Sequence, residues 1–108
     1  MATVHGALGQ SAPAATTLTT CYTVPAAKHA TIKIAACNRA AVADTFRVAV
    51  SPGGAGIANA HYVAYDQTID ANDAVSSVAM LVGSTDVVRV YSTAGNMSFS
   101  VTGIEEDD

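Results

Sequence analysis

The chain has 108 residues, a formal net charge of −4 and only 13% charged residues. This length allows one domain with one hydrophobic core. Half of the residues are apolar, but only 6% are aromatic and tryptophan is absent. We therefore expect a thin core that contact with neighbouring protein completes. The low charge indicates a surface of small and polar residues that suits packing against protein, with no positive field for nucleic acid or an anionic membrane surface.

Both ends of the chain are expected to lie outside the core. Residues 1–15 are rich in alanine and glycine and show no periodicity, which predicts an N-terminal arm, either mobile or lying over a neighbour. Residues 16–104 are expected to form the domain, and residues 105–108 a solvated acidic tail. No basic region followed by a long apolar stretch begins the chain, so no export signal is expected, and no run reaches membrane-spanning length. The arm supplies the candidate contacts with a partner protein, which are Thr3, Val4, His5, Leu8 and Gln10.

Period-two alternation of apolar and polar residues is the main structural signal. The candidate strand at 16–24 ends at Pro25, which has no amide proton for a sheet, and we expect it to form a hairpin with 31–38. A third strand at 45–51 runs into a loop rich in proline and glycine. The segment at 61–69 predicts a strand that ends in an acidic turn.

The last part of the chain continues this pattern. The apolar spacing at 74–82 suits either a helix or a strand, and its β-branched residues favour a strand. Segments 86–92 and 97–102 are expected to form a second hairpin. These short strands predict an all-β fold, an antiparallel two-layer β-sandwich of jelly-roll-like type, with a small β-barrel as the alternative.

The sequence predicts no enzyme, no cofactor and no metal site. The three histidines, His5, His29 and His61, have no neighbour at a spacing that would make a metal pair or a catalytic base. The glycine-rich loop lacks the lysine and hydroxyl of a phosphate loop, and the acidic turn lacks the closing acid of a calcium loop. Cys21 and Cys37 match no zinc pattern, and buried free thiols are favoured over a disulfide between them.

Two tyrosines offer the alternative of a sugar-binding surface. Tyr62 and Tyr65 lie three residues apart and are expected on opposite faces of the strand at 61–69. An exposed tyrosine can stack on a sugar ring, although packing of the ring with its hydroxyl at the rim is the commoner role. A free sugar-binding module is therefore one hypothesis for this chain.

Six segments, taken in order, resemble a known family over residues 16–104. These segments are Thr20-Cys-Tyr-Thr-Val-Pro-Ala-Ala-Lys28, Cys37-Asn-Arg39, Asp44-Thr-Phe-Arg-Val-Ala-Val-Ser-Pro52, His61-Tyr-Val-Ala-Tyr65, Asn72-Asp73 and Thr85-Asp-Val-Val-Arg-Val-Tyr91. Together they resemble the small virion structural proteins of tailed bacteriophages, which are described as head decoration (cement) or tail-fibre-like proteins. Members of that family usually have glycine where this chain has Ala27.

The resemblance implies a β-sandwich on the outside of the virion, assembled in the host cytoplasm. The first expectation is a decoration protein that binds the major capsid protein, associates with itself as a homo-oligomer and stabilises the head. The alternative is a tail, baseplate or fibre component that contacts host-surface glycans. Neither reading includes nucleic acid or a membrane as a partner.

Overall fold

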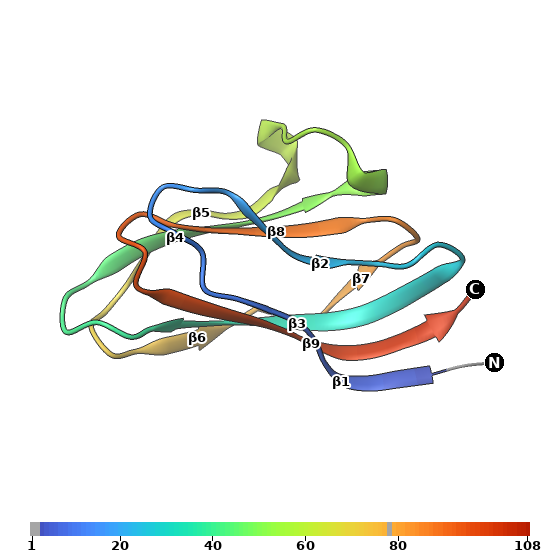
Figure 1. The fold of residues 1–108 in the computed structure, drawn as a ribbon, viewed down its shortest axis with the longest axis horizontal. Helices are drawn as coiled ribbons and strands as arrows, with labels where there is room; N and C mark the ends of the chain where they lie inside the picture. The colour runs from blue at the N-terminus through green and yellow to red at the C-terminus, as the bar shows by residue number, and fades with distance from the viewer. Residues whose placement is uncertain (1–2, 78) are drawn as a thin grey trace.

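The computed structural model describes residues 3–77 and 79–108 of the chain, and within them nine β-strands form two layers (Figure 1). Two short 3-10 helices, η1 (Pro52–Gly54) and η2 (Asn59–His61), lie in the loop between the fourth and fifth strands. The strands are β1 (Thr3–Ser11), β2 (Thr19–Thr23), β3 (Lys28–Asn38), β4 (Asp44–Ser51), β5 (Tyr62–Ile69), β6 (Ala74–Ser76), β7 (Met80–Val82), β8 (Val87–Ser92) and β9 (Met97–Asp107).

The two layers are separate antiparallel sheets. The five-stranded sheet has the order β1-β9-β3-β6, with β7 also paired to β3, and the four-stranded sheet has the order β2-β8-β4-β5. The expected antiparallel two-layer sandwich is confirmed. The alternative of a closed barrel is wrong, because no strand pair joins one sheet to the other in the described part of the chain.

The core fills the space between the sheets. From Ala30 to Asn38 in β3 the side chains alternate strictly between buried and exposed, as expected for a strand with one face on a core. Phe46 on β4 meets Phe99 on β9 edge to face across the core, with ring centroids 6.0 Å apart. Most of the other buried positions hold valine, isoleucine or alanine, so the core is thin, as the composition indicates.

Both expected hairpins are wrong. β2 pairs with β8 and β3 pairs with β9, so the chain passes from one sheet to the other between β2 and β3 and again between β8 and β9. The alternation in sequence shows that a strand has one buried face, but it carries no information on which strand lies beside it. A short connection between two such strands can join two sheets as well as two neighbours in one sheet.

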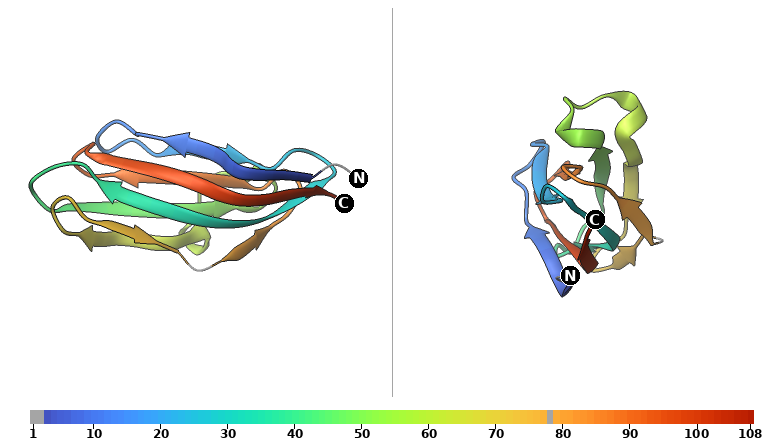
Figure 2. Two further views of the ribbon diagram at one scale, coloured as in Figure 1. Left: turned by 90° about the horizontal axis from the view of Figure 1, so that it is seen from below. Right: turned by 90° about the vertical axis from the view of Figure 1, so that its right-hand side faces the viewer.

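The N-terminal segment is part of the sandwich rather than an arm outside it. Thr3–Ser11 forms β1, which pairs with β9 at the edge of the five-stranded sheet (Figure 2). Its alternation is hidden in the sequence by two features. Alanine and glycine do not mark a face, and a bulge between Ala7 and Gly9 breaks the period of two.

The acidic end of the chain is also ordered, contrary to expectation. Residues 105–107 complete β9, and the Lys28 ammonium and the His29 ring contact Asp107 and Asp108. The run of acids therefore does not lie free in solvent, because the start of β3 places basic side chains beside it.

The segment at 74–82 is extended at both ends but is not one strand. β6 pairs with β3 over 35–37 and β7 pairs with β3 over 30–32, and between them the Ser77 amide donates to the Ile34 carbonyl at 2.8 Å. The mixed helical and extended spacing in the sequence corresponds to two short strands, and residue 78 of the predicted strand lies outside the described residues.

Candidate functional site

A wide exposed surface lies on the side of the five-stranded sheet that faces away from the core. Paired residues of neighbouring strands point to the same side of a sheet, so the register identifies the members of this surface, which we call the outer face. No other element of the described chain covers it (Figure 2). The outer face includes Thr3, His5, Ala7 and Gln10 on β1, Ser98, Ser100, Thr102, Ile104 and Glu106 on β9, and His29, Thr31, Lys33, Ala35 and Cys37 on β3.

The outer face is almost uncharged. Lys33 and Glu106 are its only formally charged members among the residues just named, and most of the others are serine, threonine or alanine. The Ile104 side chain is exposed in the same row as His5 and Thr31, and the exposed Leu81 of β7 extends that row. A wide sheet surface of small, uncharged side chains loses less solvation than a charged surface when another protein packs on it.

The residues predicted as partner contacts fall into two groups. Thr3, His5 and Gln10 lie on the outer face, and Gln10 Nε2 donates a hydrogen bond to Ser100 Oγ at 3.3 Å. The bulge after Ala7 keeps Gln10 on this face in spite of its odd spacing from His5. The other two residues do not belong to the outer face. Val4 shares a row with the buried Glu105 and is 46% exposed, whereas Leu8 packs against the core.

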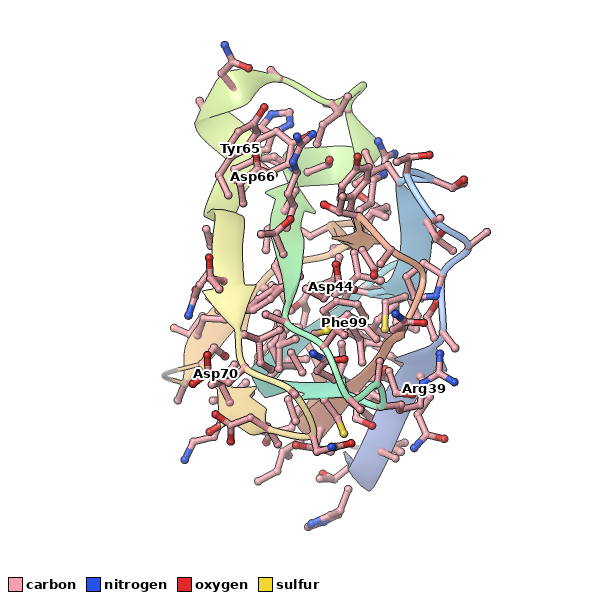
Figure 3. All side chains as sticks on the ribbon, turned by 90° about the vertical axis from the view of Figure 1, so that its left-hand side faces the viewer. Arg39, Asp44, Tyr65, Asp66, Asp70 and Phe99 are labelled. Atoms are coloured by element: carbon pink, nitrogen blue, oxygen red, sulfur yellow. The ribbon has the colours of Figure 1, made fainter. Side chains whose placement is uncertain are left out.

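A second cluster lies on the four-stranded sheet and contains both predicted aromatic residues. The Arg47 guanidinium lies between the rings of Tyr65 and Tyr91, 4.2 and 4.4 Å from their centroids. Its Nε donates to Asp66 Oδ1 at 2.6 Å and its Nη2 donates to Oδ2 at 3.3 Å. Tyr65 and Asp66 are adjacent residues in the middle of β5 (Figure 3). We call Arg47, Tyr62, Tyr65, Asp66 and Tyr91 the aromatic cluster.

The expectation that Tyr62 and Tyr65 lie on opposite faces of their strand is wrong. Their rings meet at a centroid distance of 4.9 Å and an interplanar angle of 88°. The pairing of β5 with β4 contains two register shifts, and Asp66 adopts a positive φ of 48°. These irregularities remove the alternation that the spacing assumes, and they bring both rings to one side.

Asp44 is a buried acid whose role the sequence does not reveal. It is 5% exposed and accepts hydrogen bonds from Ser92 Oγ at 2.6 Å and from the amides of Thr45 and Ala94 at 2.7 and 3.0 Å. Burial pushes its pKa upward, but the hydrogen bonds from Ser92 and the backbone amides outweigh burial and hold the pKa below its ordinary value. The carboxylate therefore stabilises the turn after β8, and both of its oxygens accept hydrogen bonds from the protein.

The two cysteines lie in different environments. Cys21 and Cys37 are free thiols, and burial raises the pKa of Cys21 to about 11. Cys37 is exposed on the outer face, so the expectation that both thiols are buried holds only for Cys21. Within residues 3–77 and 79–108, no three histidine, cysteine or acidic side chains gather as metal ligands. The same residues contain no helix long and apolar enough to span a membrane.

Comparison with known proteins adds no relative. No family model, no curated protein and no solved structure matches the chain. The resemblance to phage virion proteins therefore stays a prediction from the sequence. The outer face and the aromatic cluster are the two surfaces from which a function can be argued.

Proposed function

We propose that this protein is a structural component of a tailed-phage virion, a head decoration (cement) protein that binds the outside of the major capsid shell and stabilises the head. The observation that supports this function best is the outer face. It spans β1, which has nine residues, and β3 and β9, which have eleven residues each. It is exposed and carries almost no charge. Such a face suits broad contact with a protein surface.

In this proposal the outer face lies against the shell and bridges adjacent capsid subunits. Each copy contributes a modest contact, and resistance to the pressure of packaged DNA comes from the sum over many copies on the particle. Self-association into a homo-oligomer raises the effective strength of each docking event for the same reason. The partners proposed are therefore the major capsid protein and further copies of this chain.

The outer face can be tested with one pair of variants on DNA-filled capsids that lack the protein. Ala35→Arg places a charged side chain in the middle of the outer face, whereas Thr20→Arg makes a matched change at an exposed site on the four-stranded sheet. We expect A35R to lose at least about tenfold in capsid binding by co-sedimentation, because burial of an unpaired charge costs more than 1.4 kcal/mol. T20R should bind like the parent.

Two results would exclude the decoration function. One is equal capsid binding by A35R and T20R. The other is a cryo-EM map of the virion in which the density of this protein lies on the tail alone. Capsids that keep their DNA equally well with and without the protein would remove the stabilising role.

The aromatic cluster supports a second candidate, a tail, baseplate or fibre component that contacts host-surface glycans. Tyr65 is 57% exposed and lies beside the Arg47–Asp66 ion pair. A sugar ring could stack on this tyrosine while its hydroxyls form hydrogen bonds with the neighbouring polar groups. Virions without the protein should then fail to adsorb to host cells. If such virions adsorb normally and leak DNA, this candidate is excluded and the decoration function is supported.

A further inference from the structure

The sandwich is closed along one side and open along the other. On the closed side β1 lies directly against β2, since a Cβ placed on Gly9 would come within 2.2 Å of the Cys21 carbonyl oxygen. The open side lies between β5 of the four-stranded sheet and β6 and β7 of the five-stranded sheet (Figure 2). Here the sheets leave a cavity of about 450 Å³.

The cavity reaches the hydrophobic core. Its inner wall is made by Ile34, Phe46 and Val48, which belong to the core and are almost fully buried. Its rim on β5 includes Val63, which is 55% exposed. A volume of this size falls in the range of ligand pockets and exceeds the packing defects of a finished core. Within residues 3–77 and 79–108, the side chains on the open side therefore leave apolar space next to the core unfilled.

One strand edge beside the cavity also has no pairing partner in the described part of the chain. In the described chain β5 pairs with β4 alone, so its other edge presents backbone N–H and C=O groups without a strand partner. Opposite it, the five-stranded sheet ends in β6 and β7, which have three residues each and meet different parts of β3. An edge of this kind is a template for pairing with another chain.

We propose that the open side receives an extended segment of a partner protein, which pairs with β5 and places apolar side chains at alternate positions in the cavity. An extended segment of this kind both fills the apolar cavity and supplies backbone partners for the free edge of β5. A small apolar molecule would fill the cavity and leave the β5 edge unpaired, and a helix would offer the edge no backbone partners. Strand addition with alternate side chains in pockets is an established mode of peptide recognition.

The charges near the open side are compatible with this occupant. Asp66 on β5 is neutralised by Arg47, so an incoming strand meets no isolated charge from this pair. Gln67 and Ser76 line the cavity and offer polar contacts to the backbone of the segment. The assignment of the segment to the shell protein rests on the proposed function, whereas the chemistry of the site does not.

A synthetic peptide tests the site on the full-length protein without any virion. The probe alternates threonine and valine between terminal lysines, and the control peptide has serine at each valine position. By NMR titration we expect the valine peptide to shift the amides of β5 and the methyl groups of Ile34 and Val48. The serine peptide should bind at least tenfold more weakly, because apolar burial supplies most of the affinity.

Variants of the protein complete the test. Ala64→Trp fills the cavity from β5, and Ala74→Trp makes the same change at an exposed residue of β6 outside the cavity. We expect A64W to lose at least tenfold in affinity for the valine peptide and A74W to bind normally. Should A64W fail to fold, Val63→Glu changes the exposed rim instead and is expected to weaken binding by a similar factor.

Several outcomes would overturn the inference. These are no saturable binding of the valine peptide, shifts confined to β1, or equal binding by A64W and the parent. Saturable binding of N-phenyl-1-naphthylamine without peptide binding would assign the cavity to a small apolar molecule. A dimer that A64W dissociates would assign it to a second copy of the chain. If the protein binds the valine peptide but does not bind capsids, the decoration function is rejected and the peptide site is retained.

Discussion

The Tyr22 hydroxyl on β2 donates a 2.5 Å hydrogen bond to Glu105 Oε2 on β9, and this contact joins the two sheets inside the sandwich. Both residues are buried. Burial, the hydrogen bond to Glu105 and the charge of Glu105 all raise the pKa of Tyr22, in that order. The tyrosine therefore stays protonated and acts as a permanent donor to the carboxylate.

The first prediction concerns this pair. Tyr22→Phe leaves the buried Glu105 carboxylate without its donor, and we expect it to lower the free energy of unfolding by about 1–3 kcal/mol. A double-mutant cycle with Glu105→Gln, measured by urea denaturation, should give a coupling energy of about 1 kcal/mol or more. A Y22F protein as stable as the parent would show that the hydrogen bond contributes nothing to the fold.

Asp44 gives the second prediction, on pH dependence. Since its pKa is lower in the folded state than in the unfolded chain, the carboxylate stabilises the fold at pH values above the unfolded pKa of about 4. This contribution should disappear as the pH falls through the folded pKa. We expect Asp44→Asn to destabilise the protein by about 2 kcal/mol at pH 7, and to reduce the loss of stability between pH 5 and pH 2 in urea titrations. Parallel curves for D44N and the parent would contradict this assignment.

The sequence predicts strands better than it predicts neighbours. The alternation at 31–38 corresponds to β3, and the buried faces of β8 and β9 follow from their patterns. The pairing of β3 with β9 is not predictable in the same way, because it depends on distant parts of the chain. The burial of Glu105 could not be predicted either, because a run of acids in a sequence indicates a solvent-exposed segment. Only the structure shows that Tyr22 and the start of β3 lie beside this run.

The same limit applies to the candidate site. Tyr62 and Tyr65 are predicted as exposed aromatics, and the structure places them in one cluster with Arg47. Their meeting depends on the irregular register of β5, for which the sequence has no clear signal. The cavity on the open side is a property of two sheet edges, and no local pattern marks it.

Ala27 gives the third prediction. Its backbone adopts a positive φ of 61°, a left-handed conformation that costs an alanine about 1 kcal/mol relative to glycine. Glycine has no Cβ and adopts this conformation without that cost. We expect Ala27→Gly to raise the midpoint of thermal unfolding by roughly 4–8 °C. As a matched control, Ala35→Gly in the extended part of β3 should lower it. Equal effects of the two changes would show that the turn is not strained.

The last prediction concerns β1, which the structure makes part of the domain. Gly9 lies so close to β2 that an added Cβ would stand 2.2 Å from the Cys21 carbonyl oxygen and 3.0 Å from the Tyr22 Cβ. Since both contacts are with the framework of β2, the strain cannot be relieved by rotation of a flexible side chain. We expect Gly9→Ala to destabilise the protein by about 3 kcal/mol or to release β1 from β2, with faster amide exchange in residues 7–11. Gly56→Ala adds the same atom where nothing lies within 4 Å and should leave stability unchanged within about 0.5 kcal/mol. If G9A is as stable as G56A and the amides of β1 exchange rapidly in both, then β1 does not close the sandwich, and the segment is the loosely attached arm that the sequence alone predicts.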